Sequence, residues 1–358
     1  MKESRIERVL DTLKEMNISQ MLVIDPMSIY YMTDVMVYPG ERFYGLLLKA
    51  NSEHVFFINK LFKVPADLAV KQVWYDDTDP VMDMVAEEMD PELVLGVDKD
   101  IKARFLLPLM EKHAANGFVN ASLAVDMTRG TKDLDEQEKM RVASNINDQA
   151  MAKFKTLIHN GVSEKEVAEK MLKVYLDLGA DGFSFEPIVS FGANAADPHH
   201  MPDDTVLKEG DCVLFDVGCI KDGYCSDMTR TFYFKSASDA CRRIYDTVRR
   251  ANEAAEALIK PGVPLSELDG AARALITDAG YGPNFTHRLG HFIGLDEHEF
   301  GDVSSVSTWV CEPGMIFSIE PGIYLTGDTG VRVEDLVLVT EDGCEVLNHY
   351  SKELEIIE

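Results

Sequence analysis

Short apolar runs and one amphipathic stretch alternate along the first third of the chain. Residues 6–16 carry apolar side chains at helical spacing, and apolar runs occupy residues 21–24, 44–48 and 55–58. Apolar residues three and four apart form one face of a helix, whereas a short continuous apolar run is typical of a buried strand. Residues 1–127 are therefore expected to form a small α/β domain.

The remaining residues, 128–358, are expected to form a second domain. The stretch 127–138 is polar and charged, and it is interpreted as a connector into a long helical pattern from residue 139 to about residue 159. The domain boundary is therefore placed near residue 127.

Capping signals and apolar runs predict the other elements of this second domain. Ser163 and Glu166 have the spacing of a capping box, so a helix is expected there, with Gly179 as its stop. Helices are expected at residues 237–259 and 265–279, and strands at 212–218, 224–234, 315–319 and 331–340. Helices mixed with antiparallel hairpins indicate an α+β domain.

Charge restricts the partners that the chain can bind. It has 358 residues, with 62 acidic against 35 basic residues and a formal net charge of −27. Binding to phosphate backbones or to anionic membrane surfaces requires clustered Lys and Arg, so neither nucleic acid nor a membrane is an expected partner. The 46% of hydrophobic residues is sufficient for one large core or two ordinary ones, so the chain is expected to be globular.

Cysteine content and hydropathy favour a reducing compartment. No apolar run approaches the ~18 residues that a membrane span needs, and the amino terminus has an amphipathic helical pattern that differs from a signal sequence. The six cysteines form no CxxC pair and are too sparse for a disulfide scaffold. A cytoplasmic protein with structural thiols is expected.

Two carboxylates occur inside a predicted hairpin. An Asp-Gly pair between two strands is a strong hairpin signal, and Asp222-Gly223 lies between the apolar runs 212–218 and 224–234. A two-residue loop there places Asp227 opposite Gly218 and diagonal to Asp216. Neighbouring carboxylates repel each other and are costly to bury unless a cation separates them. A metal ion explains this pair better than the alternative, in which one Asp caps a strand or lies at an exposed edge.

Two more carboxylates and one imidazole stand in similar apolar surroundings. Glu320 follows the apolar strand 315–319, and Glu334 interrupts the apolar run 331–340. His291 lies in the phrase GHFIG, which is a weak pattern alone, because a lone His is more often a structural residue than a ligand. The three residues gain weight as possible ligands through their combination with Asp216 and Asp227.

The ordered set of Asp216, Asp227, His291, Glu320 and Glu334 resembles the pita-bread metallopeptidases, the superfamily of methionine aminopeptidase, aminopeptidase P, creatinase and prolidase. Four other phrases are similar to those of bacterial Xaa-Pro dipeptidases, namely DPMSIYYMTD, YPGERFYG, INKLF and FSFEPIVSFGANAADPHHMPDD. The resemblance covers nearly the whole chain. It implies an α/β amino-terminal domain, with lid and dimer contacts, before an α+β pita-bread catalytic domain.

The resemblance also departs from the family pattern at two positions. Phe292 stands where many relatives have Gly, and Gly301 stands where a Pro commonly follows the His-Glu phrase. These two changes are expected to reshape the pocket wall without touching a metal ligand.

The resemblance implies a centre of two divalent ions. Asp227 and Glu334 would serve both ions, Asp216 would bind one of them, and His291 with Glu320 would complete the other. Four carboxylates and one imidazole suit Mn²⁺, with Co²⁺ or Zn²⁺ as alternatives. Glu320 would also carry a proton from the attacking water to the leaving proline nitrogen.

Other basic residues are implied to contact the substrate. His199 and His298 would face the peptide and stabilise the oxyanion, although His199 is also consistent with a solvated turn. His287 would line the wall. Arg288 is the first candidate for binding the free carboxylate of proline, and Arg332 is the second, since it could instead support a metal ligand.

The loop at residues 39–42 has a further implied role. By resemblance it could form a lid over the active site of a partner subunit in a homodimer, with Arg42 as a substrate contact. An ordinary charged surface loop is the alternative interpretation of the same residues.

The expected function is two-metal hydrolysis of the Xaa-Pro bond in dipeptides, with release of proline. Aminopeptidase P, which cuts the same bond in longer peptides, is the main alternative. A non-catalytic binding protein on the same fold would have lost metal ligands, and all five are present. Creatinase activity is disfavoured for the same reason, and methionine aminopeptidase activity because that enzyme needs no separate amino-terminal domain.

Overall fold

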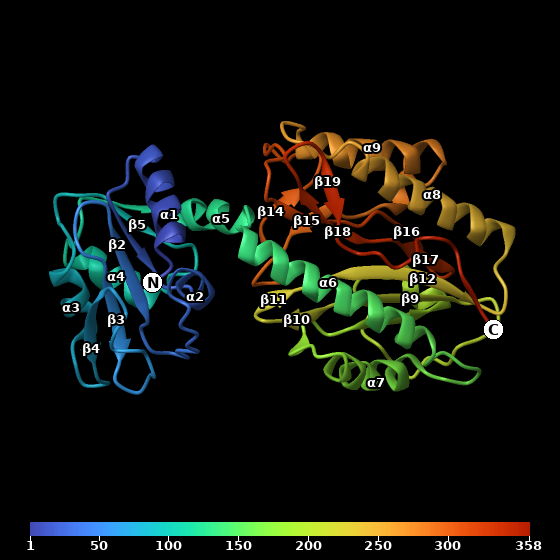
Figure 1. The fold of residues 1–358 in the computed structure, drawn as a ribbon, viewed down its shortest axis with the longest axis horizontal. Helices are drawn as coiled ribbons and strands as arrows, with labels where there is room; N and C mark the ends of the chain where they lie inside the picture. The colour runs from blue at the N-terminus through green and yellow to red at the C-terminus, as the bar shows by residue number, and fades with distance from the viewer. The chain divides into compact units, whose positions relative to one another are not determined.

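The computed structural model describes all 358 residues, and the chain folds into two compact units (Figure 1). The first unit contains residues Met1–Arg129, and the second contains Gly130–Glu358. No helix is both long and apolar enough to cross a membrane.

The first unit is built on one mixed sheet of six strands, in the order β4-β3-β2-β1-β5-β6. Its strands are β1 (Gln20–Val23), β2 (Gly45–Lys49), β3 (Val55–Asn59), β4 (Lys71–Tyr75), β5 (Leu95–Val97) and β6 (Phe118–Asn120). Its helices are α1 (Glu3–Glu15), α2 (Pro26–Thr33), α3 (Val81–Glu87), α4 (Ala103–Glu111) and α5 (Ser122–Gly130). The predicted first helix and first three strands are confirmed as α1, β1, β2 and β3, because fully buried strands must be apolar along their whole length.

The second unit has four longer helices, α6 (Leu134–Lys155), α7 (Glu164–Asp177), α8 (Asp239–Glu256) and α9 (Leu265–Asp278), and two 3₁₀ turns, η1 (Gly192–Ala196) and η2 (Gly282–Asn284). The predicted helix caps are present: Ser163 and Glu166 form a capping box at the start of α7. Two adjoining core clusters fill this unit, one with residues from α8 and α9 and the other with residues from α6 and α7. Figure 1 shows the strands of this unit between these two pairs of helices.

The strands of the second unit form small, mainly antiparallel sheets. They are ordered β11-β10-β7, β20-β12-β9-β8, β14-β13-β15-β18-β19 and β16-β17. Their bounds are β7 (Gly182–Phe183), β8 (Ile188–Phe191), β9 (Cys212–Val217), β10 (Cys219–Lys221), β11 (Tyr224–Cys225), β12 (Met228–Phe234), β13 (Gly290–Phe292), β14 (Glu299–Val303), β15 (Ile316–Ile319), β16 (Gly322–Leu325), β17 (Thr329–Arg332), β18 (Asp335–Val339), β19 (Cys344–Val346) and β20 (Ile356–Ile357).

The expected connector at residues 127–138 was wrong, because most of this stretch is helical. Its first residues belong to α5, and α6 begins at Leu134. Asp133 and Glu136 form a capping box, each accepting a hydrogen bond from the backbone N–H of the other. Charged side chains in a first helical turn accept hydrogen bonds from free backbone N–H groups and interact favourably with the helix dipole. Such a turn is therefore as polar as a loop, and its composition does not distinguish the two.

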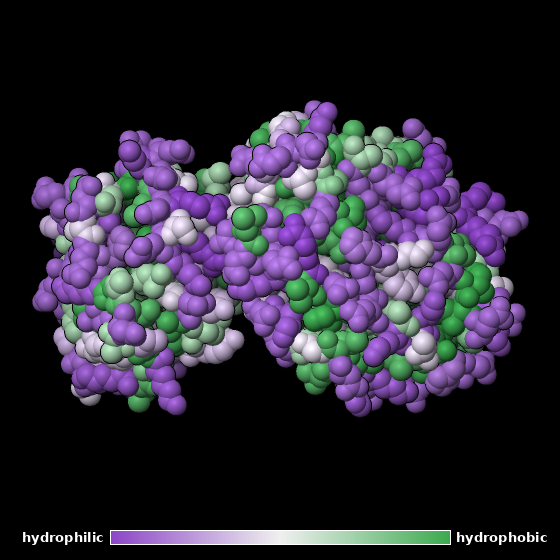
Figure 2. All heavy atoms as spheres, viewed as in Figure 1, coloured by the Kyte–Doolittle hydropathy of each residue, from purple (hydrophilic) through white to green (hydrophobic).

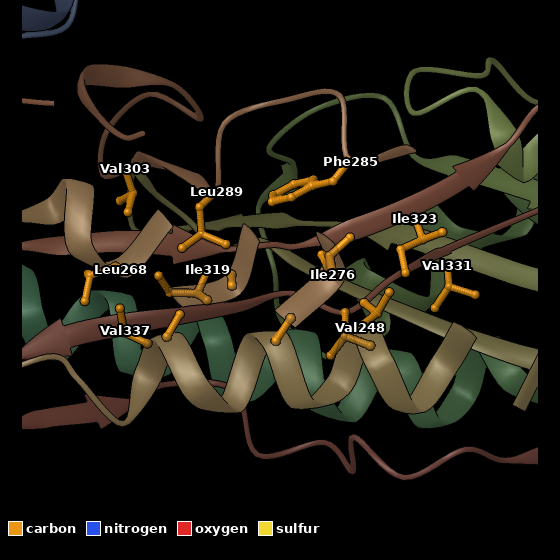
Figure 3. Packing of buried hydrophobic residues seen from close by; sticks show 14 of the residues in the cluster. Val248, Leu268, Ile276, Phe285, Leu289, Val303, Ile319, Ile323, Val331 and Val337 are labelled. Carbon is orange, nitrogen blue, oxygen red and sulfur yellow. The ribbon is translucent and has the colours of Figure 1, made fainter. Parts of the chain in front are cut away.

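The larger core cluster supports the strands that carry the candidate site. In Figure 3, Val248 of α8 and Ile276 of α9 belong to the same buried cluster as Ile319 of β15 and Val331 of β17. The buried strands therefore pack on one side against the apolar side chains of α8 and α9.

The surface has a different character. Hydrophilic residues predominate on the face shown in Figure 2, and hydrophobic residues form only scattered groups there, in keeping with the net charge of −27.

Candidate metal centre and active-site pocket

The hairpin register that was predicted from Asp222-Gly223 is confirmed. Lys221 pairs with Tyr224, and the same register continues where Asp216 of β9 pairs with Thr229 of β12. Both turn residues have positive φ, +50° for Asp222 and +83° for Gly223, as a two-residue I′ turn requires. Asp227 lies in the break between β11 and β12. The common register of the flanking pairs places it opposite Gly218 and diagonal to Asp216 of β9, as expected.

The other three candidate ligands come from a different group of strands. His291 lies on β13, Glu320 directly follows β15, and Glu334 lies between β17 and β18. The backbone N–H of Glu334 donates to the carbonyl oxygen of Thr229 at 3.1 Å, and the Thr229 hydroxyl donates to Glu334 Oε2 at 2.7 Å. These contacts join Glu334, which follows the β16–β17 hairpin, to β12, which directly follows Asp227 and pairs with β9, the strand of Asp216.

All five candidate ligands line one pocket of about 370 Å³. Nε2 of His291 is 3.6 Å from Asp227 Oδ2 and 3.7 Å from Glu320 Oε1. One ligand atom each from Asp227, His291 and Glu334 lie within 4.8 Å of one another. The structure therefore brings together residues that are more than a hundred positions apart in the sequence.

The carboxylates of this centre are held in an environment that opposes their charge. Burial, and then repulsion by neighbouring carboxylates, raises the pKa of Asp227 and of Glu334 well above the usual range. Burial raises the pKa of Glu320 to about 7, with Arg332 acting in the opposite direction. Burial lowers the pKa of His291 to about 3, so its ring is neutral at physiological pH.

His291 presents a lone pair to the carboxylates. Its Nδ1 lies 3.2 Å from the carbonyl oxygen of Phe292, which can only accept a hydrogen bond. The Nδ1 atom therefore carries the proton, and Nε2 faces Asp227 and Glu320 as an acceptor. A neutral imidazole in this tautomer is a suitable metal ligand.

The residues of the centre fit divalent cations. Two buried carboxylate oxygens, Asp216 Oδ1 and Asp227 Oδ1, have no hydrogen-bond partner in the protein. Buried carboxylate oxygens are normally satisfied, and oxygen ligands with one imidazole suit hard or borderline divalent ions. Cations at this position would satisfy the free oxygens and remove the mutual repulsion.

Arg332 lies beside this centre and holds Asp216. Its Nη2 donates to Asp216 Oδ2 at 2.5 Å, its Nη1 donates to the Tyr324 hydroxyl at 2.9 Å, and its Nε donates to the Thr229 hydroxyl at 3.0 Å. The guanidinium is buried, with 2% of the side chain exposed. These contacts engage all three nitrogens of Arg332 with oxygens of the protein, the carboxylate of Asp216 among them.

Four other predicted residues line the same pocket: His199, His287, Arg288 and His298. The rings of His291 and His298 lie 4.1 Å apart, centre to centre. Burial, and then the positive charge of Arg288, lowers the pKa of His298. Arg288 is exposed at the pocket, and its guanidinium has no hydrogen-bond or ion-pair partner in the protein.

His287 has a different environment from the other pocket histidines. Its Nε2 lies 2.8 Å from the Tyr324 hydroxyl and its Nδ1 lies 2.7 Å from the Arg288 carbonyl oxygen. Burial, and then Arg332, lowers its pKa to about 4. These contacts hold the ring as part of the wall.

Arg42 belongs to the first unit, where it forms a two-pronged ion pair. Its Nε and Nη2 donate to the two carboxylate oxygens of Asp77, each at 2.8 Å, and its Nη1 lies 3.0 Å from Glu41 Oε1. The guanidinium is therefore engaged within its own unit.

Sequence reasoning missed Glu164, which organises the loop that carries His199. Glu164 begins α7 and is fully buried. Its carboxylate contacts four nitrogens, those of the Phe191 backbone, the Asn194 side chain, the His200 ring and the Asp203 backbone. A Glu in the first turn of a helix is usually exposed and stabilises the helix start. Glu164 and Glu166 therefore look alike in the sequence, and only the burial of Glu164 in the structure distinguishes them.

The two departures from the family pattern lie in contact with each other, away from the pocket. Phe292 is fully buried and packs against Trp309 and Phe317. Gly301 has φ +110°, and a Cβ there would lie 2.8 Å from the Phe292 ring. The expected change in the pocket wall was therefore wrong: successive residues of a strand face opposite sides, so Phe292 points into the core while His291 points into the site.

Fold and site together define a metal-dependent hydrolase. Residues 138–341 match the model of metallopeptidase family M24, and residues 5–130 match that of the creatinase/prolidase N-terminal domain. An uncharacterized peptidase of Staphylococcus aureus (strain MSSA476) is 38% identical over 357 residues, which cover 98% of this chain and all of that protein.

Two solved structures are similar over almost the whole length. A prolidase from Thermococcus sibiricus has a TM-score of 0.92 at 30% identity, over 99% of both chains. An Xaa-Pro dipeptidase from Bacillus anthracis has a TM-score of 0.89 at 31% identity, over 99% of this chain and 100% of that one. The chain belongs to metallopeptidase family M24, and its predicted fold, an α/β domain before a pita-bread catalytic domain, is confirmed.

Proposed function

We propose that this metallopeptidase hydrolyses the Xaa-Pro bond of dipeptides with two divalent ions and releases proline. The observation that carries the proposal is one pocket in which four carboxylates and a neutral imidazole converge beside an unpaired guanidinium. The carboxylates and imidazole suit a metal centre, and the guanidinium suits a free carboxylate of a short substrate.

The five ligands have different places in the proposed centre. Asp227 and Glu334 are proposed to contact both ions, Asp216 to bind one of them, and His291 with Glu320 to complete the other. When bound, two such ions lower the pKa of water and polarise the attacked carbonyl group. Mn²⁺ is the proposed metal because most donors are carboxylate oxygens, and Co²⁺ or Zn²⁺ could replace it.

Glu320 is proposed to carry the proton during hydrolysis. Its Oε1 lies 3.7 Å from Nε2 of His291 inside the pocket, where a carboxyl group can accept a proton from water and release it to a leaving group. The Ser318 hydroxyl donates to Glu320 Oε1 at 3.2 Å, which orients the group. In this role Glu320 accepts a proton from the attacking water and donates it to the leaving proline nitrogen.

His298 and His199 are proposed to stabilise the oxyanion, with His287 as part of the pocket wall. Arg288 is proposed to bind the carboxylate of proline, because it is the pocket cation that has no protein partner. Arg332 is the weaker candidate for this role, since its three nitrogens already donate to protein oxygens.

The proposed state of the protein is a cytoplasmic homodimer. All six cysteines are free thiols, which suits a reducing compartment. Tyr38 and Leu61, on the first unit, have 85% and 67% of their surface exposed, and such apolar side chains suit a subunit contact. The loop at residues 39–42 is proposed to take part in that contact.

The test measures proline release from Met-Pro and Leu-Pro, with Met-Pro-Gly as the longer substrate. The chelated protein is expected to be inactive, and Mn²⁺ is expected to restore cleavage of both dipeptides. Full turnover by metal-free protein would refute the metal mechanism. Faster cleavage of Met-Pro-Gly than of Met-Pro would instead assign aminopeptidase P activity.

A further inference from the structure

Glu297 is a pocket carboxylate that the proposed mechanism does not use. It lies in the turn between β13 and β14, and it lines the same pocket as the five candidate ligands. Its side chain is 30% exposed. It is the one carboxylate on the pocket wall that is outside the proposed ligand set.

Buried hydrogen bonds and an ion pair fix the turn that carries Glu297. Glu299 accepts a hydrogen bond from the backbone N–H of Leu295 at 3.1 Å and pairs with Lys132 at 2.7 Å, and both charged side chains are almost fully buried. The backbone N–H of Cys225 donates to the carbonyl oxygen of Gly294 at 2.8 Å. A side chain on such a fixed turn can make a directional contact with little loss of entropy.

No cation of the protein balances the charge of Glu297. Nδ1 of His298 lies 3.5 Å from its Oε1, and the pKa of that histidine is lowered by burial and by Arg288. Burial, and then Asp216, raises the pKa of Glu297 to about 7, and no cation acts in the opposite direction. Arg332 donates to Asp216, and not to Glu297.

The two unbalanced charges of the pocket act on different groups. The charge of Arg288 influences His291, His298 and Glu320, whereas Glu297 is influenced by Asp216. Arg288 precedes β13 and Glu297 lies in the turn that follows it, so the free guanidinium and the free carboxylate enter the pocket from the two ends of this strand. A substrate with an anionic end and a cationic group would match this arrangement.

We propose that Glu297 is a specificity residue that binds an ammonium group on the first residue of the substrate. This inference deepens the proposed function, because it assigns the cationic end of the same dipeptide that Arg288 is proposed to hold by its carboxylate. The ammonium group has two possible sources, the α-amino group and a basic side chain. Both present N–H donors with a positive charge, which form charge-assisted hydrogen bonds with a carboxylate.

The first experiment compares manganese-loaded wild type with Glu297→Gln on Lys-Pro, Met-Pro and the desamino analogue of Met-Pro. If Glu297 binds the side chain, the variant loses about tenfold in kcat/KM for Lys-Pro relative to Met-Pro. If it binds the α-amino group, the variant loses about tenfold for Met-Pro relative to its desamino analogue. Both results support the proposal, and they identify the source.

The exposed Glu209→Gln is the matched control and is expected to leave both ratios unchanged. The metal content of every variant is measured by elemental analysis. The proposal is overturned if Glu297→Gln preserves both ratios. It is also overturned if the variant loses bound metal, because Glu297 would then act as a ligand.

A second measurement does not depend on turnover. Calorimetry compares the binding of hexanamide, norleucinamide and lysinamide, a series that adds the α-amino group and then the side-chain ammonium group. Wild type is expected to gain affinity at one of these additions, and Glu297→Gln is expected to lose that gain. Absence of dipeptide cleavage by wild type would refute the proposed function, whereas absence of the ammonium gain would refute the role of Glu297.

Discussion

At the scale of single residues, the surroundings of a side chain determine its role. Arg288 and Arg332 line the same pocket and were both candidates for binding proline's carboxylate. Arg332 is buried and its nitrogens donate to Asp216, Tyr324 and Thr229, whereas Arg288 is exposed and unpaired. Only an unpaired guanidinium can bind a substrate without first breaking contacts within the protein.

Replacing Arg288 with Ala is expected to raise KM for Met-Pro about 10- to 100-fold, since a hydrogen bond to a charged group contributes about 1.5–3 kcal/mol. Metal content is expected to remain unchanged. Steady-state kinetics on Met-Pro and on its carboxamide provide the measurement: wild type should prefer the free acid, and the variant should lose that preference. An unchanged preference would remove Arg288 from this role.

At the scale of elements, short strands and turns bring the candidate ligands together. Three of the five stand at strand breaks or ends: Asp227, Glu320 and Glu334. A residue at a strand end can direct a carboxylate into the pocket while the strand itself stays apolar and packs in the core. The same logic applies to α7, whose first residue, Glu164, holds the loop that carries His199.

Replacing Glu164 with Gln is expected to lower the free energy of unfolding by about 1–3 kcal/mol, because the amide cannot accept all the hydrogen bonds that the buried carboxylate accepts. Glu166→Gln, on the exposed side of the same helix, is the matched control and should cost little. Urea unfolding gives the two midpoints, and kcat for Met-Pro reports on the position of His199. Equal midpoints for the two variants would show that the loop does not depend on Glu164.

At the scale of the whole molecule, the repelling carboxylates of the second unit reduce the stability of the metal-free protein. The folded-state pKa of Glu320 is raised to about 7, and those of Asp227 and Glu334 are raised further above their usual range. The folded protein therefore binds more protons near neutrality than the unfolded chain. Stability must then fall as pH rises through this range.

The metal-free protein is expected to lose about 1 kcal/mol of stability between pH 6.5 and pH 8 from Glu320 alone. Over the same window the lowered pKa values of His287 and His291 act in the opposite sense, by about 0.4 kcal/mol each, so the Glu320 contribution is isolated by comparison with Glu320→Gln. Thermal unfolding measures the effect, and Mn²⁺ at a hundred times its Kd should add about 2.7 kcal/mol. A pH dependence that is the same in metal-free wild type and in metal-free Glu320→Gln would contradict this account.

The expected homodimer is also a property of the whole molecule. Sedimentation velocity is expected to give a mass near twice the 40.0 kDa of one chain. Replacing the exposed Tyr38 and Leu61 together with Ser should shift the population towards the monomer, because these side chains are proposed to lie in the contact. A monomeric wild type would refute the dimer proposal.

The sequence by itself determined the elements and the identity of the candidate ligands. Periodicity and capping signals are local, so they predicted α1, the hairpin of Asp222-Gly223 and the start of α7 correctly. Carboxylates inside apolar strands can also be recognised from the sequence alone, because burying them requires a compensating charge. The same local logic failed at residues 127–138, where a charged first helical turn has the composition of a loop.

Only the tertiary structure decided how these residues meet. Contacts between β12 and the Glu334 turn, the burial of Glu164, the packing of Phe292 against Gly301 and the isolation of Glu297 all join distant parts of the chain. Burial and charge balance depend on every neighbour in three dimensions, so no local pattern can report them. The sequence thus identified which residues could bind metal, and the fold determined which charges remain free for a substrate.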